Sequence, residues 1–212
     1  MTEILLIIMA MTLLYLSIAN RLFTYIRILV LQGFLLFGAT FFTLTTLTFA
    51  NLTFIMIETI VFKAIAVPWF LNYLIKQNGI TRETEPFLPY FISLMIVTLI
   101  IVATIFIASS IDEIYLDKIY FIVALSTLFT GLYLIITRRK IITHVIGYLI
   151  IENGVFILSL AVGNEMPMLV NMGILLDIFA SVFILGIFFN KIGDVLKDPD
   201  ANQLNSLKDG FL

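Results

Sequence analysis

The chain has 212 residues, of which 61% are hydrophobic and only 12% are charged, and its formal net charge is −2. A soluble domain is typically about half apolar and about a quarter charged, so this composition excludes an ordinary soluble globular protein and indicates a chain surrounded by lipid. The sequence has no cysteine, which excludes disulfides, iron–sulfur clusters and thiolate metal sites within this chain. With a single histidine, a self-contained transition-metal site is also a poor fit.

The first apolar segment, MTEILLIIMAMTLLYLSIAN, has no basic region at its start and no small-residue cleavage site. It therefore predicts a retained transmembrane helix and not a cleaved signal. A helix that crosses a bilayer core about 30 Å thick needs about twenty apolar residues. By this measure the sequence predicts an all-α membrane protein with seven transmembrane helices. They span residues 3–19, 22–44, 52–75, 87–109, 118–137, 141–162 and 166–189.

Three prolines bear on these helices. Pro86 and Pro167 fall where first-turn prolines are expected. Pro68 lies inside the third predicted helix, and a proline there removes a backbone hydrogen bond. The sequence therefore predicts a kink at this point.

The basic residues fall mainly in one set of loops, and basic loops remain on the cytoplasmic side of a membrane. The opposite side has Lys118 as its one base. This bias predicts an amino terminus outside, a transmembrane domain over residues 1–190 in the cytoplasmic membrane, and a cytoplasmic tail over 191–212. The bases of the cytoplasmic loops are Arg21, Lys76, Arg82, Arg138, Arg139 and Lys140.

A weak internal similarity relates the two halves of the chain. The second and sixth predicted helices each carry a polar residue followed by glycine, and an acid follows in the next helix. Gly33 precedes Glu58 by 25 residues, and Gly154 precedes Asp177 by 23. One interpretation is a parallel repeat of three helices, one extra helix and three helices. The alternative is chance similarity between lipid-facing segments.

Four ionisable residues fall deep inside the predicted helices: Glu58, Lys63, Glu152 and Asp177. Two others, Arg27 and His144, lie closer to the cytoplasmic end. Each charge in a membrane helix costs about 2.5–3.5 kcal/mol on insertion scales, and such residues usually face the bundle interior and mark ion or proton paths. The short turn VGNEMP makes the sixth and seventh helices antiparallel neighbours, so the carboxyls of Glu152 and Asp177 are predicted to approach each other. They are the first candidates for a proton site. The alternative is that they only form polar contacts between helices.

His144, Tyr148 and Glu152 are spaced four residues apart, so they share one face of the sixth helix. At 1.5 Å per residue they extend over about 12 Å, from the cytoplasmic side to mid-membrane. This arrangement predicts an entry path for protons. The alternatives are an interfacial His144 and a space-filling Tyr148.

Glu58 and Lys63 are five residues apart, which separates them by about 140° around an α-helix. They are therefore not expected to form an ideal pair on one face. Lys63 lies too deep to reach water and must find a carboxylate or a buried water. A proton relay would use such a lysine, whereas a static ion pair between helices is the alternative. Gln32 and Asn153, each beside a glycine, predict close helix packing.

Several segments resemble a known family. The stretches RLFTYIRILVLQG and FKAIAVPW in the amino half, with IGYLIIENGVFIL and GILLDIFASVFILGI in the carboxyl half, are similar to the hydrogenase 4 membrane component E family. This resemblance covers essentially the whole chain.

The carboxyl half also resembles the K (4L) subunit of respiratory complex I, which has three helices, a double-basic loop and one buried Glu in each of the last two helices. Arg138 and Arg139 match that loop, and Asp177 matches the acid of the last helix. The other acid departs from the pattern, because the family Glu falls on Leu149. Glu152 lies about one helical turn further along.

The resemblance implies a subunit without a catalytic site of its own, in an energy-converting complex such as a group 4 [NiFe] hydrogenase, a formate hydrogenlyase or a relative of complex I. Residues 118–190 would be the subunit-K-like unit. The implied partners are antiporter-like membrane subunits and the membrane anchor of the redox arm. The [NiFe] and iron–sulfur centres would lie in partner chains, with no cofactor in this one. The alternatives are a subunit of a multi-subunit Na⁺/H⁺ antiporter, a free-standing seven-helix transporter and a purely structural assembly subunit.

Overall fold

A computed structural model describes most of the amino-terminal three quarters of the chain. All described residues except Gly186 belong to the unit Met1–Gly173, and the second unit is Ile174–Leu212. Apart from Gly186, the predicted helix over 166–189 and the tail over 191–212 lie outside the described residues. The residues described are 1–43, 53, 56–77, 88–111, 117–138, 140–161 and 186.

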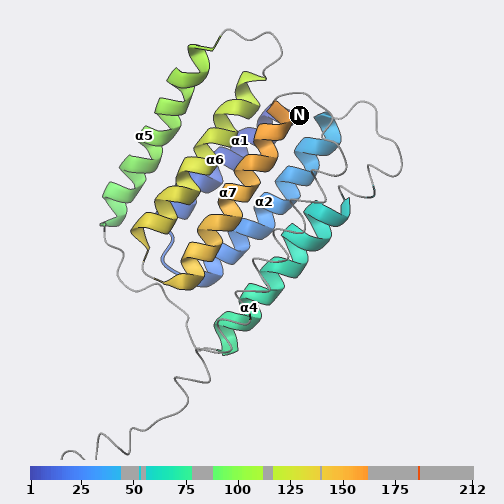
Figure 1. Ribbon diagram of the computed structural model, residues 1–212, viewed down its shortest axis with the longest axis vertical. Coiled ribbons are helices and arrows are strands. Elements are labelled where there is room, and N and C mark those ends of the chain that lie inside the picture. Colours follow the sequence, from blue (N-terminus) through green and yellow to red (C-terminus); the bar gives the residue numbers. More distant parts are fainter. Residues whose placement is uncertain are drawn as a thin grey trace, which may run out of the picture. The chain divides into compact units, whose positions relative to one another are not determined.

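The described residues form helices and contain no β-strand, which confirms the all-α class. Five helical segments are long and apolar enough to cross a membrane, and a sixth apolar helix has 17 residues. The molecule is therefore a multi-pass membrane protein. The elements, shown in Figure 1, are α1 (Thr2–Ile18), α2 (Leu22–Thr43), η1 (Ile57–Ala66), α4 (Val67–Gln77), α5 (Tyr90–Ser109), α6 (Lys118–Thr137) and α7 (Ile141–Ala161).

Helices α6 and α7 form a closely packed antiparallel pair. Asp117 caps the start of α6 by accepting hydrogen bonds from the backbone N–H groups of Ile119 and Tyr120, at 3.1 and 3.4 Å. The Asp117 N–H donates to the carbonyl of Ala161 at the end of α7, at 2.9 Å. Along the pair, the two helices approach through glycines, as is common where membrane helices pack backbone to backbone.

Helix α2 lies between α7 and the η1–α4 segment, and it packs on both as well as on α1 (Figure 1). One hydrophobic cluster of the unit is formed by side chains from α1, α2, α6 and α7, whereas α5 packs mainly on α6 and α1 and turns most of its side chains outward. Because α2 contacts both α7 and η1, it brings together the elements that carry Glu58, Lys63 and Glu152. The residues of this cluster are Leu6, Met9, Leu35, Leu36, Ala39, Tyr120, Val123, Ala124, Phe156, Ile157 and Ala161.

The segment η1 is π-helical, which the sequence did not predict. In a π-helix each N–H bonds to the carbonyl five residues earlier, so residues five apart lie close to one another on the same side. Glu58 and Lys63 are accordingly both buried, with 0% and 7% of their surface exposed. The sequence predicts no ideal pair between them on the basis of α-helical spacing; the π-helical segment places both on the buried side, and the described residues show no ion pair between them.

The hydrogen-bonding pattern changes at Pro68, where the sequence predicts a kink. The segment is π-helical up to Ala66 and α-helical from Val67. Proline has no backbone N–H to donate, so one backbone hydrogen bond is absent at Pro68 in either type of helix. The change from π-helical to α-helical bonding at this position therefore costs no additional hydrogen bond.

The close approach of α6 and α7 gives a first prediction. A Cβ atom added at Gly131 would lie 2.7 Å from the Gly147 carbonyl oxygen, which is backbone and cannot yield. Gly131→Ala should therefore destabilise the protein by about 1–3 kcal/mol, the usual range for overpacking. Gly38→Ala is the matched control, because its Cβ would meet only the end of the Leu5 side chain at 3.0 Å. Thermal unfolding in detergent measures both, and equal unfolding temperatures would contradict this account of the α6–α7 contact.

Candidate functional site

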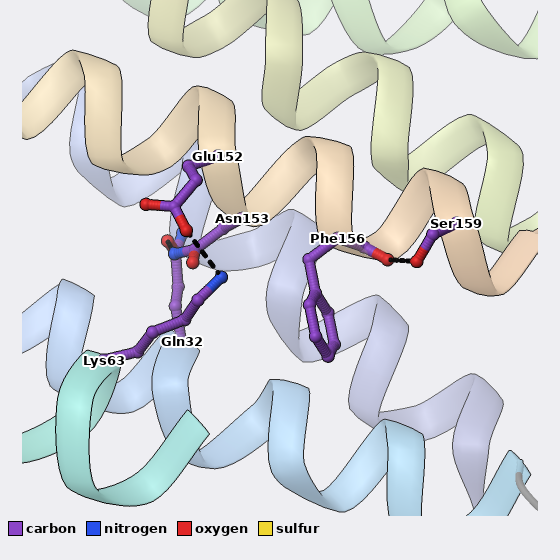
Figure 2. Close-up of polar contacts among 6 residues, drawn as sticks. All are labelled: Gln32, Lys63, Glu152, Asn153, Phe156 and Ser159. Carbon is purple, nitrogen blue, oxygen red and sulfur yellow. Dashed lines mark hydrogen bonds and ion pairs between the residues drawn. The ribbon is translucent and has the colours of Figure 1, made fainter. Parts of the chain in front are cut away.

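The described part of the chain contains a buried ion pair between η1 and α7. The Lys63 ammonium nitrogen Nζ lies 3.1 Å from Oε1 of Glu152, and the two side chains are 6% and 9% exposed (Figure 2). The depth of Lys63 in its predicted helix indicates that its ammonium needs a carboxylate or a buried water as a partner. In the structure this partner is the carboxylate of Glu152. The pair joins helical elements that are far apart in the sequence.

The surroundings of this pair are apolar on one side. The Phe156 ring, one turn along α7 from Glu152, lies with its centroid 4.8 Å from Lys63 Nζ. An ammonium over an aromatic face gains a modest electrostatic attraction. Lys63 is therefore held by one carboxylate and one ring in an interior that otherwise disfavours charge.

Glu58 is a second carboxyl group near this pair. It is fully buried, and neither carboxyl oxygen has a hydrogen-bond partner among the described residues. Within that part of the chain, Glu58 and Lys63 form no ion pair shorter than 4 Å, yet Glu58 interacts electrostatically with both Lys63 and Glu152. The structure thus brings two acids and one base together, with the base bound to the acid of the other helix.

Gln32 connects three helices beside the ion pair. Its Oε1 accepts a hydrogen bond from Asn153 Nδ2 on α7 at 3.1 Å, and its Nε2 donates to Thr12 Oγ1 on α1 at 2.9 Å. The predicted packing role of Gln32 and Asn153 is consistent with these contacts. Their direct bond could not be expected from sequence, because the two residues are 121 positions apart.

The structure places His144 and Tyr148 on α7 with Glu152. His144 Nε2 is hydrogen-bonded to the backbone carbonyl of Arg138 at 2.7 Å, and Tyr148 is half-buried one turn before Glu152. Leu149, where the resemblance predicts the family Glu, and Glu152 are both buried. Asp177 lies outside the described residues.

Arg138 is a buried residue that sequence reasoning assigned only to a cytoplasmic loop. It is 2% exposed, and its Nη2 donates to the Ser17 carbonyl near the end of α1, at 2.9 Å. A cation is favourable at the carboxyl end of a helix. Nothing in the local sequence signals this contact. Its neighbour Arg139 lies outside the described residues.

The described residues include no group of three or more His, Cys, Asp or Glu side chains that could hold a metal ion. Their buried polar side chains form an ion pair and hydrogen bonds between helices. The arrangement defines a helical multi-pass membrane protein with titratable groups in its interior.

Residues 119–209 match the family model of NADH-ubiquinone/plastoquinone oxidoreductase chain 4L, which confirms the resemblance of the carboxyl half to that subunit. Hydrogenase-4 component E of Escherichia coli (strain K12) is 31% identical over 86 residues, which are 41% of this chain and 40% of that protein. The uncharacterized protein Rv0085 of Mycobacterium tuberculosis is 22% identical over 158 residues, covering 72% of this chain and 71% of that protein. The chain thus aligns with about two fifths of hydrogenase-4 component E. No solved structure matches it.

The ion pair gives a second prediction. Removing one partner of a buried pair leaves an uncompensated charge and typically costs about 3–5 kcal/mol, whereas replacing both partners by apolar residues is often close to neutral. Lys63→Met should therefore lower the unfolding temperature, and Lys63→Met with Glu152→Leu should recover most of the loss. A double-mutant cycle on thermal stability in detergent measures the coupling. Additive effects of the two substitutions would show that the pair does not form.

Proposed function

We propose that this chain is an integral membrane subunit of an energy-converting, complex I-related complex of the hydrogenase or formate hydrogenlyase type, and that it contributes buried ionisable groups to a proton path. The observation that carries the proposal is the Lys63–Glu152 contact of 3.1 Å inside an apolar helix bundle. The similarity to chain 4L and to hydrogenase-4 component E supports the type of complex.

The chemistry of the path rests on exchange between one base and two acids. The Lys63 ammonium gives its proton to a carboxylate, which leaves a neutral amine and a carboxylic acid, and it takes a proton back in the reverse step. Glu152, in direct contact, is the first acceptor, and Glu58 is the second. Lysine suits this role because its ammonium releases a proton far more readily than an arginine guanidinium does.

The path has two further parts. His144 and Tyr148 lead from the cytoplasmic side toward Glu152 along one face of α7, spaced four residues apart. Asp177, which the sequence assigns to a seventh helix outside the described residues, is the remaining acid of the proposed path. In this arrangement the amino terminus is outside and the tail over 191–212 is cytoplasmic.

The proposed neighbours are antiporter-like membrane subunits and the membrane anchor of a hydrogenase-type redox arm. The [NiFe] and iron–sulfur centres would belong to partner chains, because the cysteine-free sequence offers no thiolate ligand. The complex would lie in the cytoplasmic membrane, where its redox arm drives the proton movement.

The proposal predicts that Glu152→Gln or Asp177→Asn leaves the complex assembled but impairs coupled proton movement. The amide keeps the size of the acid and one acceptor oxygen but cannot carry a proton. Glu3→Gln is the control, because Glu3 is an exposed carboxylate on α1. A pH-sensitive dye in vesicles reconstituted with the complex measures the movement. Normal pumping by both variants would remove the relay role and leave a structural one.

Lys63→Arg separates charge pairing from proton carriage. Arginine keeps the positive charge beside Glu152 but does not deprotonate in proteins. We therefore expect a stable complex whose proton movement falls about 10²-fold, the scale typical of a lost proton-transfer group. Lys76→Arg, at an exposed lysine of α4, is the matched control and should have no effect. Full activity in the Lys63→Arg variant would show that Lys63 is only a counter-charge.

A further inference from the structure

Two adjacent residues of α2, Gln32 and Gly33, contact the residues that follow the two partners of the ion pair. Gln32 is bonded to Asn153, which follows Glu152 directly in α7. Gly33 contacts Ala64, which follows Lys63 directly in η1. Figure 2 shows Gln32 beside Asn153, next to the Lys63–Glu152 contact.

The contact at Gly33 is between backbones. A Cβ atom added there would lie 2.9 Å from the Ala64 Cβ and 3.0 Å from the Ala64 Cα and backbone N. An ordinary contact begins at 3.4 Å, so any side chain at position 33 must move η1 away from α2. Glycine at this position therefore sets how closely η1 approaches α2.

The contact at Gln32 fixes the other side. Gln32 is fully buried, and both ends of its amide are bonded, to Asn153 and to Thr12. Thr12 in turn donates to the Met9 carbonyl of α1 at 2.6 Å. Because each group has its partner, the rotation of α7 at Asn153 is held relative to α1 and α2.

We infer that the Gln32–Gly33 step of α2 is a positioning device that sets the separation and orientation of Lys63 and Glu152. Among the described helices, α2 alone packs closely on both η1 and α7. A change in how either element sits on α2 therefore changes the distance across the ion pair. The expected effect on proton movement rests on the proposed function. The effect on the geometry of the Lys63–Glu152 pair does not, because it is measured separately.

The test is a pair of identical substitutions in one helix. Gly33→Ala adds a methyl group against the Ala64 backbone, whereas Gly38→Ala adds the same group against the flexible end of Leu5. The readout is the infrared carboxyl band of Glu152 in the intact complex, identified by its loss in Glu152→Gln. We expect this band to shift in Gly33→Ala and to stay unchanged in Gly38→Ala. An unshifted band in Gly33→Ala would overturn the inference.

Proton movement is measured in the same preparations. A separation changed by as little as 1 Å can slow a transfer by about 10²-fold, so Gly33→Ala should lose most of its coupled proton movement. A shifted band with normal proton movement would support the positioning role and reject the proton path. The two ideas therefore fail separately.

If Gly33→Ala does not assemble, a second variant tests the inference. In it the methyl group is moved from residue 64 to residue 33, on the other side of the same contact. Gly33→Ala combined with Ala64→Gly removes the nearest atom, at 2.9 Å, but leaves the Ala64 Cα and N positions at 3.0 Å. We expect an assembled complex with a smaller shift of the Glu152 band. No shift in this double variant would also overturn the inference.

Discussion

The interaction on which the structure depends is the pairing of Lys63 with Glu152 in an interior that has little other means of accommodating charge. An unpaired ammonium there would be strongly unfavourable, so η1 and α7 must stay within one contact distance of each other. This requirement explains why the helices around the pair approach through small residues. Gly33 brings η1 against α2, and Gly154 brings α7 against Leu128 of α6. The glycines allow the backbones to come close enough for two side chains to meet.

The π-helical turn of η1 serves the same requirement. Because they are five positions apart, Glu58 and Lys63 would point in different directions from an α-helix. The wider helix returns both to the buried side, so that one base stands near two acids contributed by two elements. Pro68 follows directly, at the point where α-helical bonding resumes. A departure from regular helix geometry often marks a functional position, and here it is the departure that gathers the ionisable groups.

The positions of the described helices follow from the sequence, because a run of about twenty apolar residues has few other solutions in a membrane. Helix α6 occupies the residues predicted for it, and the burial of Glu58, Lys63 and Glu152 was expected from their rarity in such helices. The partner of Lys63 was not predictable. Local spacing offers Glu58, but the choice of Glu152 depends on the π-helix and on how α2 holds η1 and α7. The Arg138–Ser17 bond is equally non-local, since it joins residues 121 positions apart.

The offset between Leu149 and Glu152 acquires a physical reason from these contacts. In the subunit-K pattern the acid would stand at position 149, whereas here it stands one turn further along α7, at about 4.5 Å of helix rise. At that level the amino half of the chain supplies two partners: Lys63 for Glu152, and Gln32 for Asn153. Both partners come from α2 and η1, helices that precede the part of the chain similar to chain 4L. Glu152 thus lies at the level of α7 where the preceding helices supply a base, Lys63, and an amide, Gln32. The contacts that join the two halves of the described unit are therefore made at or beside its buried charged residues.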